Sequence, residues 1–140
     1  MKFFGTSGIR AVFNEDLVNL AFRAGMAVGK VYGNVVVGTD TRTSGDVVKH
    51  AVISGLLAAG ARCRDAGVAP TPTLAFITRE FGAGVMVTAS HNPPQYNGIK
   101  FLNPYGSSFG SSQQEQVEEG ILTEPLEVAR WEEIKHSSVA

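Results

Sequence analysis

Apolar residues along most of the chain recur with one of two periods, one typical of helices and one typical of buried strands. Residues 15–32 carry apolar side chains at helical spacing, with Asn14 as the expected N-cap and Gly33 as the expected left-handed terminator. The same spacing predicts further helices at 43–60, 70–81 and 112–120. Short apolar runs predict strands at 34–38, 61–66, 84–87 and 99–102.

Helices and strands alternate along the chain until the last two strands, which follow each other directly. Such an order predicts an α/β/α fold: a single domain with a mixed, mainly parallel sheet sandwiched between helices. The periodic pattern stops after Leu126, and the last residues look like a connection. We therefore expect one domain over residues 1–130 and the start of a linker to an absent second domain over residues 131–140.

Composition and charge narrow the class of protein. Hydrophobic residues make up 44% of the 140-residue chain, as in globular domains. A net charge of −1 argues against a broad nucleic-acid surface. The sequence has neither an apolar run long enough to span a bilayer nor a signal peptide, so we expect a cytoplasmic protein with no membrane partner. The single cysteine, Cys63, is expected to be a buried thiol.

The candidate chemistry lies in three glycine-containing polar loops, at residues 5–10, 38–45 and 88–100. The third loop, TASHNPPQYNGIK, places Ser90 just after an apolar strand. A Ser-His hydrolase is excluded because Ser90 and His91 are adjacent and point in opposite directions in an extended chain. The glycine-flanked turn that hydrolases place around the serine is also absent.

Phosphoryl transfer fits this loop better. That chemistry needs a hydroxyl acceptor and cationic groups for the phosphate oxygens, usually with a divalent ion. Ser90 supplies the hydroxyl, and the three loops together supply positive charge from Arg10, Arg42, His91 and Lys100. Simpler interpretations stay open for three of these cations. His91 could be an ordinary loop residue, Lys100 a solvated strand residue, and Arg42 a residue that holds the loop by its backbone carbonyls.

The Ser90 loop resembles the phosphoserine loop of the α-D-phosphohexomutases, a family that includes phosphoglucomutase, phosphomannomutase and phosphoglucosamine mutase. Residues 5–10 resemble the family's amino-terminal motif, and residues 38–45 resemble its second strand-loop-helix motif. The three motifs occur in family order and the resemblance covers nearly the whole chain. Ala11 departs from the pattern, since the family usually has glycine after the first motif's arginine.

The resemblance implies that Ser90 is a phosphoserine in the active enzyme. It would donate its phosphoryl group to a hexose 1- or 6-phosphate, and the resulting bisphosphate would turn and return its other phosphoryl group. Ser90, Lys100, Arg10 and His91 are the implied catalytic residues. The implied substrate- or phosphate-binding residues are Ser7, Arg42, Asn92 and Asn97.

The resemblance also implies one Mg²⁺ per full-length enzyme, held by the phosphate oxygen on Ser90 and by aspartates of a second domain. The family's Asp-x-Asp-x-Asp metal loop is absent from this sequence, which matches only the first of four family domains. A hexose 1,6-bisphosphate is the implied activator and intermediate. The expected partners are a sugar phosphate and the remaining domains of the same polypeptide, and the isolated chain is expected to be inactive.

Two other functions remain open at this point. The chain could bind phosphorylated sugars without turnover, or it could be a phosphatase that uses Ser90 in a site open to water. Within the mutases, the residues after Asn92 favour the phosphoglucomutase/phosphomannomutase branch, and hence glucose or mannose, over phosphoglucosamine mutase as the parent enzyme.

Overall fold

A computed structural model describes residues 2–5 and 8–139. The first helix, α1 (Glu15–Tyr32), has the predicted bounds and the predicted caps. Its N-cap Asn14 accepts a hydrogen bond from the Leu17 amide at 3.0 Å, and Gly33 ends the helix with a φ of 67°. The other helices are α2 (Gly45–Ala58), α3 (Thr71–Ile77) and α4 (Ser111–Leu122), with short 3₁₀ turns η1 (Thr78–Glu80) and η2 (Trp131–Glu133).

Six strands form one sheet with the order β1-β5-β4-β2-β3-β6. The strands are β1 (Ile9–Val12), β2 (Asn34–Thr39), β3 (Arg62–Val68), β4 (Ala83–Val87), β5 (Tyr96–Leu102) and β6 (Ser138–Val139). The pairs β2–β3, β2–β4 and β3–β6 are parallel, whereas β4–β5 and β1–β5 are antiparallel. The predicted mixed, mainly parallel sheet is confirmed.

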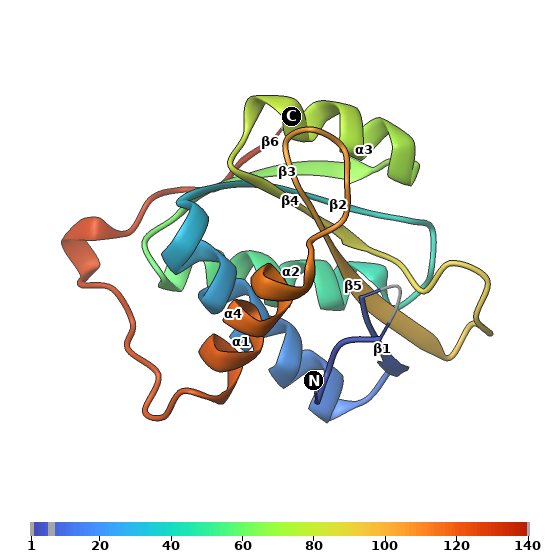
Figure 1. The fold of residues 1–140 in the computed structure, drawn as a ribbon, viewed down its shortest axis with the longest axis horizontal. Helices are drawn as coiled ribbons and strands as arrows, with labels where there is room; N and C mark the ends of the chain where they lie inside the picture. The colour runs from blue at the N-terminus through green and yellow to red at the C-terminus, as the bar shows by residue number, and fades with distance from the viewer. Residues whose placement is uncertain (1, 6–7, 140) are drawn as a thin grey trace.

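Helices cover both faces of the sheet (Figure 1), with α1, α2 and α4 on one side and α3 on the other. Alternate strand residues supply the two cores, because successive side chains of a strand point to opposite faces. Val35, Val37 and Phe101 face the three-helix side, while Val36 and Met86 pack against Leu74 of α3. The predicted α/β/α layering is therefore confirmed.

The sequence pattern missed the two edge strands. Residues 5–10 were expected to form a loop, so β1 was not predicted as a strand, and Ile9 is its one fully buried residue. It becomes a strand by pairing with β5 from Ile9↔Ile99 to Val12↔Tyr96. The same pairing starts β5 at Tyr96 rather than at the predicted Ile99. At the other edge, β6 is two residues long and pairs with Arg64 and Asp65.

The third helix is shorter than predicted. The expected helix over 70–81 ends at Ile77 and tightens into η1. Thr78 is fully buried at this point, and its hydroxyl donates to the Leu74 carbonyl at 2.8 Å. A side-chain hydroxyl that takes the carbonyl four residues back competes with the helical backbone bond, which favours the tighter turn.

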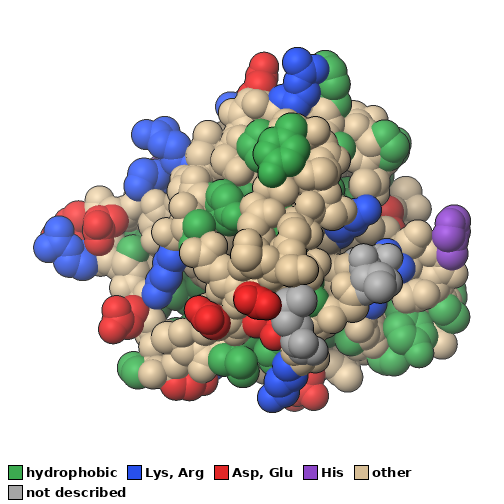
Figure 2. Space-filling view, in the orientation of Figure 1, with side chains coloured by type: hydrophobic (Ala, Val, Ile, Leu, Met, Phe, Trp, Pro, Cys, Tyr) green, Lys and Arg blue, Asp and Glu red, His purple; other side chains and the backbone are tan. Residues whose placement is uncertain are grey.

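Cys63 lies on β3 and is 3% exposed, so the predicted buried thiol is confirmed. Burial, with a smaller contribution from the charge of Asp65, raises the pKa of its thiol to about 12. On the face shown in Figure 2, acidic and basic side chains are interspersed rather than gathered in one charged patch. None of the helices in the described part of the chain is both long and apolar enough to cross a bilayer.

Candidate active site

The second and third sequence motifs meet at the carboxyl ends of two neighbouring parallel strands. Residues 40–44 follow β2 and residues 88–95 follow β4, and both segments lie at the right-hand end of the sheet in Figure 1. The Asp40 amide donates to the Val87 carbonyl at 3.2 Å, which joins the two segments at their start. Loops in this position form the ligand sites of open α/β sheets.

Ser90 has an uncommon backbone conformation and lies in the loop that follows β4. Its φ is 56°, in the left-handed region, and it is the only residue other than glycine with a positive φ in the described part of the chain. The preceding Ala89 is fully buried, whereas Ser90 is exposed. Among the described residues the Ser90 hydroxyl has no hydrogen-bond partner, so it is presented to solvent.

Thr88 and Asp40 hold the main chain on the inner side of this turn. The Ser90 amide donates to the Thr88 hydroxyl oxygen at 3.0 Å, and that hydroxyl donates to an Asp40 carboxylate oxygen at 2.7 Å. Thr88 is only 8% exposed. The Asp40 carboxylate also accepts from the Arg42 amide at 3.1 Å. Asp40 therefore has a structural role, because its carboxylate bonds residues of both loops.

The Arg42 guanidinium binds the main chain of the Ser90 loop. Its two terminal nitrogens donate to four backbone carbonyls at 2.7–3.1 Å, those of Ser90, Asn92, Pro93 and Tyr96. Its Nε lies 3.5 Å from the Asp40 carboxylate, and the side chain is 14% exposed. The structure thus shows the arrangement that the sequence left open for Arg42, in which the arginine holds the loop by its carbonyls.

Gly8 of the first motif contacts the middle of β5. Gly8 has a φ of 89°, and a Cβ there would lie 2.5 Å from the Ile99 carbonyl oxygen and 3.2 Å from the Lys100 Cα. Only glycine permits this approach. Residues 6 and 7 lie outside the described residues, and with them the predicted site residue Ser7.

Arg10 is a residue of β1 and lies beside the Ser90 loop. It pairs with Gly98, and a Cβ on Gly98 would lie 2.8 Å from the Arg10 Cγ and 2.9 Å from the Thr88 carbonyl oxygen. The Arg10 Nε is buried and has no hydrogen-bond partner among the described residues. An unpaired buried donor of this kind is uncommon in folded proteins. Ala11, the departure from the family pattern, packs against the core on the other face.

Lys100 lies two residues after Gly98 on β5, so it projects from the same face of the sheet as Arg10. It is half-buried and lies next to Gly8. The structure therefore brings Lys100, Arg10 and the Ser90 loop to one edge of the sheet, although they come from three different parts of the sequence.

The remaining predicted site residues differ in exposure. His91 is exposed. Asn92 is half-buried, and its backbone amide donates to the Ala89 carbonyl at 3.1 Å. Asn97 is fully buried: its side-chain nitrogen donates to the Ser44 hydroxyl at 2.9 Å, and its side-chain oxygen accepts from the Gly98 amide. Asn97 thus links the end of the loop to the N-cap of α2.

Sequence reasoning assigned no role to Thr88. The available signal was a hydroxyl two residues before Ser90, since Ser and Thr side chains commonly accept from a nearby backbone amide. The link from Thr88 to Asp40 has no such local signal, because the two residues are 48 positions apart.

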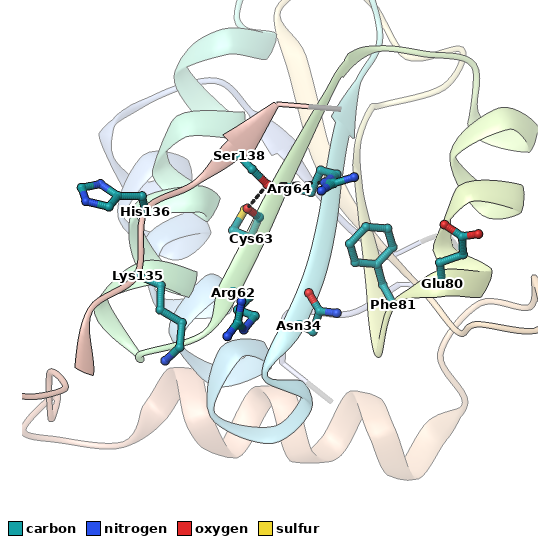
Figure 3. A pocket seen from close by; sticks show the side chains of 9 residues that line it. All are labelled: Asn34, Arg62, Cys63, Arg64, Glu80, Phe81, Lys135, His136 and Ser138. Carbon is teal, nitrogen blue, oxygen red and sulfur yellow. Dashed lines mark hydrogen bonds between the residues drawn. The ribbon is translucent and has the colours of Figure 1, made fainter. Parts of the chain in front are cut away.

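A hollow of about 710 Å³ lies at the end of the sheet opposite the Ser90 loop. It is lined in part by Asn34 and Arg62, at the starts of β2 and β3. Figure 3 shows that its cationic side chains do not converge: Arg64 is directed toward Phe81 and His136 points away from the others. The Lys135 ammonium donates to the Gly60 and Glu133 carbonyls. This hollow therefore lacks the convergent polar groups of a binding site.

No group of three or more His, Cys, Asp or Glu side chains that could hold a metal ion occurs within residues 2–5 and 8–139. Near Ser90 the carboxylate is that of Asp40, and it is already bonded to Thr88 and Arg42. The described residues therefore do not by themselves form a Mg²⁺ site.

Comparisons with known proteins agree on one family. The family model for the phosphoglucomutase/phosphomannomutase alpha/beta/alpha domain I matches residues 1–127. A "Probable phosphoglucosamine mutase" of Methanococcoides burtonii is 48% identical over 99% of this chain and 32% of its own length. Its Thermococcus kodakarensis counterpart is 50% identical over 95% of this chain and 31% of its own length.

Solved structures share the fold. A phosphoglucomutase/phosphomannomutase family protein from Burkholderia thailandensis superposes with a TM-score of 0.73 and 27% identity, over 99% of this chain and 32% of its own. A Thermus thermophilus structure superposes with a TM-score of 0.78 and 33% identity, over 98% of this chain and 32% of its own. The chain thus spans about a third of the length of the relatives that it matches.

Proposed function

The chain belongs to the phosphoglucomutase/phosphomannomutase family, as its α/β/α domain I, and from this premise we propose that it is the phosphoserine-bearing part of a hexose-phosphate mutase. Ser90 accepts and returns the phosphoryl group. The observation that carries the proposal is the exposed Ser90 hydroxyl, held on a left-handed turn that follows the carboxyl end of β4.

The reaction is an exchange of phosphate between two hydroxyls of one sugar. The phosphoryl group of phospho-Ser90 passes to the free hydroxyl of a hexose 1- or 6-phosphate, and the hydroxyl proton leaves as the new P–O bond forms. The bound bisphosphate then turns and returns its other phosphoryl group to Ser90. Arg10 and Lys100, which share one face of the sheet, orient the phosphate and handle this proton.

Mg²⁺ is the ion that fits this chemistry, because it prefers phosphate and carboxylate oxygens. On this chain the phosphate oxygen on Ser90 would be its ligand, and the other ligands would come from elsewhere in a longer polypeptide. When bound, the ion offsets negative charge on the transferring group. The isolated 140-residue chain lacks those ligands, so turnover belongs to the longer protein.

The substrate is a hexose phosphate, and the names of the relatives favour an amino sugar. The Methanococcoides, Thermococcus and Methanococcus aeolicus relatives, at 44–50% identity, carry the name phosphoglucosamine mutase. This supports glucosamine phosphate over the glucose or mannose phosphate that the sequence of the Ser90 loop favoured. Rates of isomerisation of the three sugar phosphates by the full polypeptide would distinguish them.

The proposal is tested by mapping the phosphoryl group after incubation of the full polypeptide with Mg²⁺ and a hexose 1,6-bisphosphate. Trypsin cleavage after Arg79 and Lys100 releases residues 80–100, in which Ser90 is the only serine. We expect the added phosphoryl group on Ser90, and loss of both labelling and isomerisation in Ser90→Ala.

The matched control is Ser137→Ala, which removes an exposed serine and is expected to leave both readouts unchanged. Labelling at Thr88, or full isomerase activity in Ser90→Ala, would overturn the proposal. Release of inorganic phosphate without isomerisation would indicate a phosphatase instead.

A further inference from the structure

The backbone of the Ser90 loop requires an external support. A left-handed φ at a residue other than glycine is unfavourable, and it persists only where the surroundings determine it. Within the segment between β4 and β5, the Asn92 backbone amide donates to the Ala89 carbonyl and the Tyr96 amide donates to the Pro93 carbonyl. Ser90 itself is bonded through its amide to Thr88 of the same segment, and through its carbonyl to Arg42 of the loop after β2.

Arg42 provides most of that support. A guanidinium has five N–H donors and no acceptor. Four of them are directed at loop carbonyls at hydrogen-bond distance, and the fifth faces Asp40. A phosphate oxygen could reach this guanidinium only by replacing one of those carbonyls. Arg42 is therefore placed to hold the loop and not to bind a ligand.

Thr88 and Asp40 act on the same residue from the other side. The Thr88 hydroxyl accepts from the Ser90 amide and donates to Asp40, while Arg42 donates to the Ser90 carbonyl. Both backbone groups of Ser90 are thus bonded to one network, which leaves the side chain as the unbonded part of the residue.

We propose that Arg42, with Asp40 and Thr88, is a positioning residue that fixes the Ser90 main chain and so aims its hydroxyl for phosphoryl transfer. The role of Ser90 in this inference rests on the proposed function. The network holds the serine in one orientation before substrate binds. A nucleophile displaced by about 1 Å can lose about 100-fold in rate.

The first test compares Arg42→Lys with Arg42→Met in the full polypeptide. Lysine keeps the charge but has only three donors on one nitrogen, so it cannot span four carbonyls. We expect both variants to slow phosphoryl uptake by Ser90 from hexose 1,6-bisphosphate about 100-fold, with KM for the sugar phosphate changed less than about 3-fold. Arg130→Lys, an exposed arginine, is the matched control and should retain the full rate.

A direct phosphate contact predicts a different pattern. Arg42→Lys would then retain most of the activity and Arg42→Met would mainly raise KM, and either result would overturn the positioning role. The Thr88 pair gives a second test. Thr88→Ser keeps the hydroxyl and should retain the rate, whereas Thr88→Val should lose it about 10-fold or more. Equal rates in Thr88→Ser and Thr88→Val would also contradict the network.

Amide hydrogen exchange separates failure of this inference from failure of the proposed function. Arg42→Met should speed exchange at Ser90 and Asn92 at least about 10-fold while the amides of β4 keep their protection. This readout does not depend on turnover. If exchange responds but wild-type Ser90 accepts no phosphoryl group, Arg42 does hold the loop and the proposed function is wrong. Unchanged exchange overturns the positioning role of Arg42.

Discussion

Two stretches of main chain outside the helices are each held by one charged side chain, and the two side chains have opposite charge. Arg42 donates to four carbonyls of the Ser90 loop. Glu118 of α4 accepts from three consecutive amides, those of Lys2, Phe3 and Phe4, at 2.7–3.0 Å. An arginine can only donate and a carboxylate can only accept, so each side chain matches the backbone groups that face it.

Arg42 and Glu118, which we call the two clamps, differ in the segment of main chain that each holds, and the Glu118 contacts depend on pH. Arg42 holds an exposed turn at the candidate site, whereas Glu118 is 7% exposed and holds the chain that leads to Gly8 and Arg10. Burial alone would raise the pKa of the Glu118 carboxyl, but the three amide hydrogen bonds outweigh it and lower the pKa. The comparison therefore predicts that the Glu118 contacts weaken in acid as this carboxylate becomes protonated.

The largest expected effect is on stability, from Glu118→Leu. This change leaves three backbone amides without their acceptor, and we expect the free energy of unfolding to fall by about 3 kcal/mol, measured by urea denaturation. Glu118→Gln keeps one acceptor oxygen and should cost about 1 kcal/mol. The neighbouring Glu119 is exposed, so Glu119→Leu is the matched control and should change stability by less than about 0.5 kcal/mol. Equal losses at the two positions would contradict the clamp.

Glu118 also shows where sequence reasoning ends. Nothing in the residue types distinguishes it from Glu119, since both lie in the polar helix that the pattern predicted. Its partners lie 114–116 residues away and are backbone amides, which have no sequence signature. The periodicity of apolar residues does not reveal side chains that bind distant main-chain groups. For Arg42, the sequence indicated these contacts only as one of two alternatives.

The elements that periodicity did predict are those that bury their own apolar face. The helix over 15–32 and the strands that become β2 and β4 have nearly the predicted bounds, because their side chains alone determine burial. The edge strands β1 and β6 become strands only through their partners β5 and β3, so their short sequences do not reveal them. The Ser90 loop was located by its motif, whereas the network that shapes its turn required the structure.

A smaller effect is expected from pH, through the same carboxylate. The pKa of Glu118 is lower in the folded chain than its ordinary value of 4.5. Its contribution to stability is therefore complete above the unfolded pKa and is lost as pH falls through the folded pKa. The difference in unfolding free energy between the wild type and Glu118→Gln should shrink as pH is lowered from about 7 to about 3. A difference that stays constant over this range would show that the charge of Glu118 does not stabilise the fold.

The smallest effect is expected where a carboxylate pairs with a side chain in solvent instead of with backbone. Glu124 lies 2.6 Å from the Arg23 guanidinium and is 67% exposed. Water replaces such a contact readily, and Arg23 keeps its bond to the Ile121 carbonyl at 3.0 Å. Glu124→Gln should therefore change the free energy of unfolding by less than about 0.5 kcal/mol, in urea denaturation with or without added salt. A loss as large as that of Glu118→Gln would mean that the charge of a carboxylate, and not the backbone amides that it satisfies, determines its contribution to stability.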